Sequence, residues 1–337
     1  MIAEDILYGR SRLGRVIQRA LHPFSVIFGS MVGLRNYLYD SGRLFSLNAN
    51  LPVVSIGNIS VGGTGKTPLT AWLAAEFLRA GLRPGIILRG YGGDEQLVHQ
   101  YLNPDAVVIA SADRMRGTVA AHAQGAKVAI LDDAFQHRRI SRGWDIVLVS
   151  ADRWNEKGRL LPAGDLREPV ESLGRGSLVI ITRKAASREK AVAIEKAIRS
   201  RFRHLPVAIV LLAPASLKDR GGNEIPLQIL NGARVLAFSA VGDNDAFQAQ
   251  LRETGAEITF RAFRDHHSFS ERDLAELAGK SATVQYVVCT LKDAVKVWPK
   301  WPADAKPLWY VSQALILESG AGALDELIGK VTADKRD

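Results

Sequence analysis

Short apolar runs alternate with amphipathic stretches through the first half of the chain. Apolar runs of strand length occupy residues 52–56, 84–88, 106–110, 128–131 and 145–149. Residues 69–78 and 114–124 repeat their apolar positions at helical spacing instead. Strands that alternate with helices predict an α/β fold, with a parallel sheet covered by helices on both faces.

The alternation stops at residues 152–175, which are rich in Gly, Pro and charged residues, and then resumes. Strands are expected at residues 178–182, 207–212, 235–239, 286–290 and 308–311, and helices at residues 187–202, 245–255, 270–279 and 321–331. We therefore expect a first domain at residues 1–151 and a second, smaller α/β domain at residues 152–337. Residues 152–175 are interpreted as the domain junction or as a long site loop.

Residues from about 5 to 46 follow a different pattern. Arg10, Arg12, Arg15 and Arg19 alternate with apolar residues at helical spacing, Pro23 interrupts, and residues 24–38 are mostly apolar. A helix packed on the protein's own core has this pattern, and so does an amphipathic helix that lies in a membrane interface. The pattern alone favours core packing. No apolar run reaches the roughly 18 residues of a membrane span, and residues 1–5 lack the residue order of a secretory signal.

Composition narrows the possible partners. Lys and Arg number 44 against 35 Asp and Glu, a formal charge of +9, which favours a nucleotide, a nucleic acid or an anionic membrane surface as the partner. Hydrophobic residues make up 47% of the 337 residues, enough for extensive cores. The single cysteine, Cys289, lies in an apolar run, so we expect a buried thiol and a reducing compartment.

The segment Ser-Val-Gly-Gly-Thr-Gly-Lys-Thr follows the first expected strand. Its three glycines allow backbone N–H groups to converge on phosphate oxygens, and a helix from about Lys66 adds a favourable dipole. Lys66 is expected to reach the β- and γ-phosphates, and the Thr67 hydroxyl to bind Mg²⁺. The expected nucleotide-binding residues are Ser60, Val61, Gly62, Gly63, Thr64, Gly65, Lys66 and Thr67. The general pattern of such phosphate-binding loops has Gly at the position of Ser60.

Three acidic or histidine-containing groups are candidates for further chemistry. Asp132 and Asp133 directly follow the strand at residues 128–131, where a P-loop enzyme positions Mg²⁺. Asp94 and Glu95 follow the Gly-rich turn at residues 89–93; a carboxylate there can accept the proton of an attacking hydroxyl, although a solvated turn explains it equally well. Asp265-His266-His267 suits base chemistry or a metal, but a polar surface loop is the simpler interpretation.

Several segments together resemble the tetraacyldisaccharide 4′-kinases, the lipid A 4′-kinases of Gram-negative bacteria. The matching stretches are residues 54–68, 88–92, 93–95, 132–137, 161–169, 263–267 and 290–296, in the order of that family. Ser60 is a habitual residue of the family's phosphate-binding loop. The chain departs from the family at Gln96, at Asp165 and in a shortened segment between Gly92 and Asp94.

The resemblance implies a reaction in which ATP, with Mg²⁺, phosphorylates the 4′-hydroxyl of a tetraacylated glucosamine disaccharide 1-phosphate. It implies a P-loop NTPase-type core and a C-terminal domain that closes over the substrate cleft. By the same resemblance, the catalytic residues are Asp94 as acid/base, His266, Lys66 and Arg114, which contacts the phosphate region, and the metal residues are Thr67, Asp132 and Asp133. Since Asp94 and His266 fall in different expected domains, we expect their pair to form fully only on domain closure.

The resemblance also changes the interpretation of the N-terminal segment. It implies that residues from about 5 to 46 lie on the cytosolic face of the bacterial inner membrane and help to collect the lipid substrate. The protein is then peripheral to the membrane, and we expect a monomer with no nucleic-acid partner.

Other functions remain alternatives at this point. A P-loop kinase or ATPase that acts on another small or lipid acceptor satisfies the same loop. A regulatory GTPase needs an Asn-Lys-x-Asp motif, and the nearest run, Thr290-Leu-Lys-Asp293, has different spacing. A nucleic-acid-dependent ATPase is suggested by charge only, since no nucleic-acid-binding module is recognisable.

Overall fold

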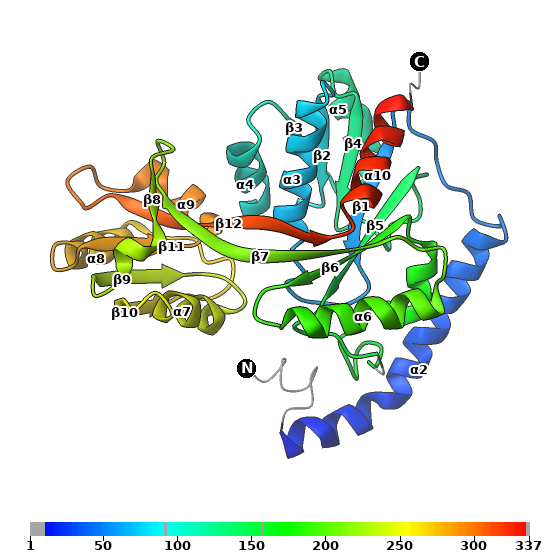
Figure 1. Ribbon diagram of the computed structural model, residues 1–337, viewed down its shortest axis with the longest axis horizontal. Coiled ribbons are helices and arrows are strands. Elements are labelled where there is room, and N and C mark those ends of the chain that lie inside the picture. Colours follow the sequence, from blue (N-terminus) through cyan, green and yellow to red (C-terminus); the bar gives the residue numbers. More distant parts are fainter. Residues whose placement is uncertain (1–10, 91–92, 157, 335–337) are drawn as a thin grey trace. The chain divides into compact units, whose positions relative to one another are not determined.

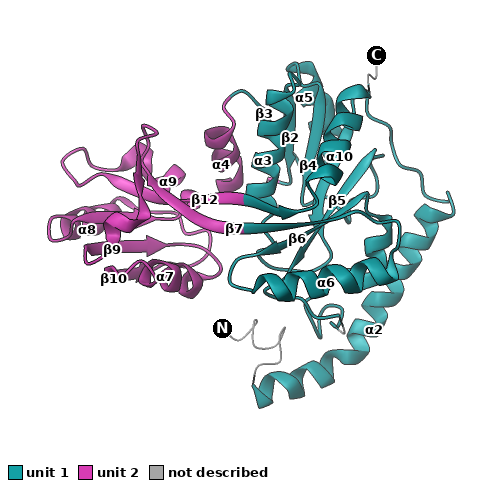
Figure 2. Cartoon of the chain, in the orientation of Figure 1, with its two compact units in different colours: residues 1–89, 105–211, 316–337 teal, residues 90–104, 212–315 magenta. Residues whose placement is uncertain are grey.

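A computed structural model describes residues 11–90, 93–156 and 158–334. Residues 1–10, including Arg10, and Tyr91 and Gly92 of the Gly-rich turn lie outside these ranges. The chain divides into two compact units (Figure 2). Unit 1 contains Met1–Arg89, Asp105–Leu211 and Ile316–Asp337, and unit 2 contains Gly90–Pro104 and Leu212–Leu315.

This division differs from the expected boundary between residues 151 and 152. The strand that follows residue 175 pairs in parallel with the strand that precedes residue 152, so both belong to the sheet of unit 1. Residues 152–175 therefore connect two strands of one unit and are not a domain junction.

Unit 1 is built on a parallel sheet, as the sequence predicts (Figure 1). The strands lie in the order β7-β6-β5-β1-β4-β2-β3, and every neighbouring pair is parallel. Their bounds are β1 Val53–Asn58, β2 Pro84–Leu88, β3 Val107–Ala110, β4 Val128–Asp132, β5 Trp144–Ser150, β6 Leu178–Arg183 and β7 Val207–Lys218. β1, β2 and β4 are buried along their whole length, which is typical of parallel strands covered on both faces.

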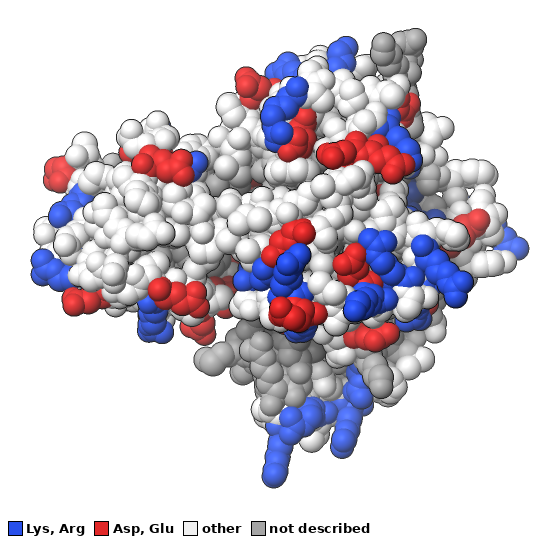
Figure 3. Space-filling view, viewed as in Figure 1, with Lys and Arg blue, Asp and Glu red and all other residues white. Residues whose placement is uncertain are grey.

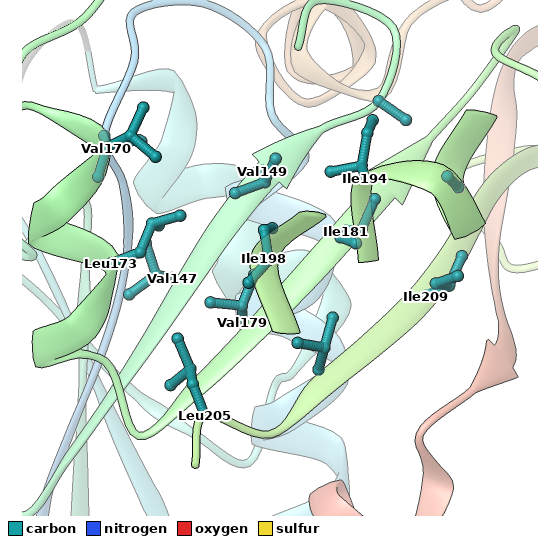
Figure 4. Close-up of a cluster of buried hydrophobic side chains, with 14 of the residues drawn as sticks. Val147, Val149, Val170, Leu173, Val179, Ile181, Ile194, Ile198, Leu205 and Ile209 are labelled. Carbon is teal, nitrogen blue, oxygen red and sulfur yellow. The ribbon is translucent and has the colours of Figure 1, made fainter. Parts of the chain in front are cut away.

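The helices of unit 1 cover this sheet. They are α3 Lys66–Arg79, α5 Arg114–Ala123, α6 Arg188–Arg201 and α10 Ala321–Ala333, with the short 3₁₀ helix η1 Val170–Arg175. One core cluster joins β5, β6 and β7 to α6 through Ile194 and Ile198, and to η1 through Val170 and Leu173 (Figure 4). A second cluster packs α5 against β1, β2 and β4. These apolar contacts fix the strand ends on which the site residues lie.

The long helix α2 (Arg12–Asp40) precedes the sheet, and Ser11 caps its start by accepting a hydrogen bond from Gly14 N. Contrary to expectation, the helix runs through Pro23 without ending there. Few residues of α2 are buried, and Ser25 is one of them. Its hydroxyl donates to Leu160 O and accepts from Ala163 N, both over 2.9 Å. Among the described residues, no helix is long and apolar enough to cross a membrane.

Unit 2 is a smaller α/β unit. It contains α4 Asp94–Leu102, β8 Glu224–Pro226, η2 Leu227–Leu230, β9 Arg234–Ser239, α7 Asn244–Arg252, β10 Glu257–Ala262, α8 Glu271–Ser281, β11 Tyr286–Cys289, α9 Leu291–Val297 and η3 Trp298–Lys300. β10, β9, β11 and β12 (Leu308–Ser319) lie in this order as parallel neighbours, and β8 pairs antiparallel with β7. β7 and β12 each continue from one unit into the other. Cys289 is buried, as predicted.

Candidate active site

The phosphate-binding loop connects β1 to α3, as the sequence predicts. Gly62 (φ 107°) and Gly65 (φ 85°) adopt left-handed backbone, which a residue without Cβ adopts at little cost. Gly65 is the N-cap of α3, so the first N–H groups of the helix face the end of the loop. Thr64 is buried; its hydroxyl accepts from Asn58 Nδ2 over 2.9 Å, and its carbonyl accepts from Thr182 Oγ1 over 2.9 Å. The loop is therefore anchored from β1 and β6.

Asp132 and Asp133 lie where β4 ends beside β1. Asp132 is buried, and its Oδ1 accepts from Thr70 Oγ1 of α3 over 3.1 Å. Asp133 is more exposed, and its Oδ1 lies 3.5 Å from Lys66 Nζ. The carboxylates expected to serve the metal and the lysine of the loop are thus brought together within unit 1.

Arg114 begins α5 and is buried. Its Nη1 donates to Ser111 O over 2.9 Å, and its Nη2 donates to Asp132 O over 2.8 Å. The guanidinium therefore joins the segment after β3 to the end of β4, next to the paired aspartates.

The segment after β5 contacts the phosphate-binding loop directly. Val61 N donates to Asp165 O, and Arg167 N donates to Ile59 O, both over 2.7 Å. Arg167 Nη1 donates to both carboxylate oxygens of Asp133, over 3.0 and 3.1 Å. Burial raises the pKa of Asp165 above its ordinary value. This segment therefore borders the candidate site, and Arg167 is a further candidate residue that no local sequence pattern indicates, although it lies within the matching stretch at residues 161–169.

Asp94 and His266 form a pair within unit 2. His266 Nδ1 lies 3.0 Å from Asp94 Oδ2, and Asp94 is only 4% exposed. Asp94 begins α4, and residues 90–104 belong to unit 2. The pair therefore forms inside one unit and requires no movement between the units, contrary to the expectation that domain closure completes it.

The backbone marks two of the candidate residues. Asp133 (φ 49°) and His266 (φ 57°) are non-glycine residues with left-handed backbone. This conformation costs about 1 kcal/mol for a residue with a Cβ, and such costs concentrate at functional sites. Backbone strain is therefore found at Asp133, which is expected to bind the metal, and at His266, which is expected to act together with the catalytic base Asp94.

Lys296 and His267 complete the surroundings of Asp94. Lys296 Nζ lies 3.3 Å from Asp94 Oδ2 and donates to His267 O over 3.2 Å. The ring of His267 is directed elsewhere, because its Nε2 lies 3.1 Å from Asp273 Oδ2. Of the two adjacent histidines, His266 is therefore the one that contacts Asp94.

The residues near the phosphate-binding loop fit Mg²⁺ bound together with a nucleotide. Within the described residues, no group of three or more His, Cys, Asp or Glu side chains could hold a metal ion. Mg²⁺ typically takes only one or two carboxylates and fills its shell with water and substrate phosphates. Two carboxylates beside Lys66 at the end of β4 match that requirement.

A parallel sheet with a Gly-rich loop between β1 and α3, and paired aspartates at the end of the neighbouring strand, defines a P-loop nucleotide-binding enzyme. The chain belongs to the family of the tetraacyldisaccharide-1-P 4′-kinases, because the sequence model of that family matches residues 17–332.

Individual relatives agree with this assignment. A tetraacyldisaccharide 4′-kinase of Chlorobaculum parvum is 34% identical over 312 residues, which cover 82% of this chain and 83% of the relative. The tetraacyldisaccharide 4′-kinase of Geobacter metallireducens is 35% identical over 315 residues, covering 85% and 90%. The crystal structure of "apo" form LpxK from Aquifex aeolicus in complex with ATP has a TM-score of 0.74 at 29% identity, and covers 94% of this chain and 99% of that chain.

Proposed function

We propose that this protein transfers the γ-phosphate of ATP to the 4′-hydroxyl of a tetraacylated glucosamine disaccharide 1-phosphate, a step of lipid A biosynthesis. Membership of the tetraacyldisaccharide-1-P 4′-kinase family over residues 17–332 carries the proposal. The phosphate-binding loop supports it, since residues 60–65 connect β1 to α3, and Lys66, the first residue of α3, lies beside Asp133.

In this proposal the residues of unit 1 bind MgATP. Backbone N–H groups of the loop and the Lys66 ammonium hold the phosphates. Thr67, Asp132 and Asp133 would hold Mg²⁺, and the bound ion would supply positive charge beside the phosphates. Arg114 acts in the same region by fixing the end of β4, because its guanidinium binds Asp132 O.

The residues of unit 2 supply the base. Asp94 accepts the proton of the 4′-hydroxyl as its oxygen attacks the γ-phosphorus. His266 holds the Asp94 carboxylate through the 3.0 Å contact of its Nδ1. We further propose that closure of unit 2 over the acceptor brings the base to the phosphate and excludes water.

The product identifies the reaction. Incubation with ATP, Mg²⁺ and an acylated disaccharide 1-phosphate is expected to add one phosphate, seen by mass spectrometry and assigned to the 4′ position by NMR. Phosphorylation of a different small acceptor, with the disaccharide unchanged, would favour the alternative of a P-loop kinase for another substrate. ADP release without any phosphorylated product would indicate an ATPase.

We also propose that α2 lies on the cytosolic face of the inner membrane. Large apolar side chains on α2 are exposed although they follow one helical stripe: Leu13, Val16, Ile27, Met31 and Leu34 are each at least 59% exposed. Figure 3 shows basic side chains around the start of this helix. An exposed apolar stripe beside cationic residues is suited to an anionic lipid surface.

Vesicle binding tests this second proposal. Replacing Ile27 and Met31 by Ser is expected to weaken sedimentation with anionic phospholipid vesicles and to lower activity on the acylated acceptor. The melting temperature should stay unchanged, because both side chains are exposed. Replacing the exposed Val119 of α5 by Ser is the matched control. Unaltered vesicle binding by the double variant would contradict the proposal.

A monomer is proposed because one chain supplies both the phosphate-binding loop and the base. Light scattering after gel filtration is expected to give the mass of one chain, and a stable dimer would contradict this.

A further inference from the structure

Lys296 connects the proposed base to a second buried carboxylate. It lies on α9, and its side chain is 14% exposed. Its Nζ lies 3.3 Å from Asp94 Oδ2 and 3.4 Å from Asp293 Oδ1. One ammonium group thus serves two carboxylates that have almost no contact with solvent, since Asp94 is 4% exposed and Asp293 is fully buried.

Asp293 is itself held rigidly. Its Oδ2 accepts from Ala240 N over 3.1 Å and from Thr290 Oγ1 over 2.6 Å. Thr290 caps the start of α9 by accepting from Asp293 N. The matching stretch at residues 290–296, for which the sequence suggested no role, therefore forms a short helix whose cap fixes the carboxylate that anchors Lys296.

A buried carboxylate stays ionised only if a partner compensates for its lost hydration. His266 can do this only when it is protonated, and its side chain is 44% exposed. Lys296 Nζ lies 3.3 Å from the same carboxylate, and its side chain is only 14% exposed. The ammonium group is therefore the more buried of the two partners of Asp94 and the one best placed to compensate for the lost hydration.

The contacts also orient the carboxylate. His266 Nδ1 and Lys296 Nζ both bind Oδ2 of Asp94. Within residues 11–90, 93–156 and 158–334, the hydrogen bonds to the Asp94 side chain all fall on Oδ2, so Oδ1 is the oxygen available to an acceptor hydroxyl.

We infer that Lys296 is a positioning residue of the reaction, which fixes Asp94 with Oδ1 toward the acceptor and keeps it ionised. This inference rests on the proposed function, in which Asp94 is the base. Other charged or titratable groups near Asp94 and Lys296 include Asp265, whose Oδ1 lies 3.9 Å from His266 Nε2, the His267–Asp273 pair and the Glu95–Lys292 pair. The buried Cys289 thiol interacts electrostatically with Asp293 and Lys296.

The pH profile of turnover tests the inference. Without the ammonium group, Asp94 takes up a proton more readily, so the acid limb of kcat for Lys296→Met is expected to move upward by about one pH unit or more. On this limb kcat falls about tenfold for each pH unit, so the variant should be about tenfold slower than wild type there, and the deficit should shrink as the pH rises. Lys296→Arg keeps the charge and is expected to restore most of the wild-type profile.

Lys292→Met is the matched control. Lys292 lies one turn earlier on α9, and pairs at 3.5 Å with Glu95, which is more exposed than Asp94. The control removes the same charge from the same helix, and its acid limb is expected to stay in place. Circular dichroism and the Kd for ATP establish that each variant is folded and binds nucleotide.

The outcomes separate the inference from the function on which it rests. A pH-independent loss of activity in Lys296→Met, or an equal shift in Lys292→Met, would overturn the positioning role. If Lys296→Met does not fold, an unshifted limb in Asp293→Asn, which removes the anchoring charge, would overturn it instead. Full activity of Asp94→Asn would instead remove the base assignment, whatever the Lys296 variants do.

Discussion

Asp133 is held by two cations that come from distant parts of the chain. Lys66 reaches it from the start of α3, and Arg167 reaches it from the segment after β5 with two hydrogen bonds. Because Arg167 Nη1 contacts both oxygens of the carboxylate, it restricts the orientation of Asp133 as well as its position. In the proposed function this fixed carboxylate serves Mg²⁺, so its orientation matters as much as its charge.

Arg167→Ala is expected to lower kcat/KM for MgATP by about tenfold to a hundredfold, the usual effect of removing a residue that orients a metal-binding side chain. Steady-state kinetics over a range of Mg²⁺ concentrations measures it, and high Mg²⁺ should recover part of the loss. Arg201→Ala, which removes an exposed ion pair with Glu171, is the control. Equal kinetics in the two variants would show that Arg167 has no part in the site.

The site residues found from sequence are those with a local pattern. Lys66 and Thr67 end a Gly-rich loop, and Asp132 and Asp133 end an apolar strand, so their neighbours in sequence reveal them. Arg167 and Lys296 acquire their role only by contacts with residues 34 and 202 positions away. No local periodicity encodes such contacts, and only the resemblance to a family included their segments.

At the scale of elements, a buried carboxylate adds to the contacts that hold α2 against the rest of unit 1. Glu168 is fully buried; its Oε1 binds Arg35 of α2 at 3.1 Å, and its Oε2 accepts from Asn36 at 2.9 Å and from Arg175 at 2.8 Å. Burial alone would raise the pKa of Glu168, but these hydrogen bonds and positive charges outweigh it, and the pKa lies below its ordinary value of 4.5. An ionised Glu168 therefore contributes to the attachment of α2, beside the hydrogen bonds of Ser25.

Glu168→Gln is expected to lower the free energy of unfolding at pH 7 by about 3 kcal/mol, because it leaves two arginines without their counter-charge. Because the pKa of Glu168 is lower in the folded protein than in the unfolded chain, its ionised form stabilises the fold at pH values above the unfolded pKa. This stabilisation is lost as the pH falls through the folded pKa. The difference between wild type and variant should therefore shrink below about pH 4.5. Urea unfolding at pH 7 and at low pH measures both values, and a difference that is constant with pH would contradict the argument.

Strong apolar periodicity made most elements predictable, and weak periodicity explains the rest. β10 was missed because its exposed and half-buried residues alternate without an apolar run. α4 and α9 were missed because nine and seven residues are too few to display a helical pattern. Pro23 was expected to interrupt α2, but the helix continues through it, and two residues later the Ser25 hydroxyl donates to Leu160 O and accepts from Ala163 N.

At the scale of the whole molecule, the residues with proposed roles belong to both units. The phosphate-binding loop belongs to unit 1, and Asp94 with His266 belongs to unit 2. The parallel sheet was predictable from the alternation of elements. The division was not, because residues 90–104 leave unit 1 and β7 and β12 pass between the units without any change of composition at the crossing points.

This division predicts that binding and transfer can be lost separately. Asp94→Asn is expected to lower phosphoryl transfer by at least about a hundredfold, while the Kd for ATP changes less than about twofold, because unit 1 is unaltered. Lys66→Ala is expected to weaken ATP binding as well, since it removes the phosphate-binding cation. Calorimetric titration with a non-hydrolysable ATP analogue measures the affinities. Weakened nucleotide binding in Asp94→Asn would contradict this separation.

The crossing strands have a consequence for how the protein is made. Unit 1 contains both the earliest described residues and Ile316–Asp337. Gly320 is the N-cap of α10, and a Cβ there would lie 2.6 Å from Ala208 Cα of β7. During translation, unit 2 is complete while unit 1 still lacks the end of β12 and α10. In nascent chains stalled once residue 315 has left the ribosome, we expect unit 2 to become resistant to protease before unit 1. The usual order is the reverse, because the N-terminal part of a chain generally folds first. Earlier protection of unit 1 in such chains would show that its sheet folds without the last helix.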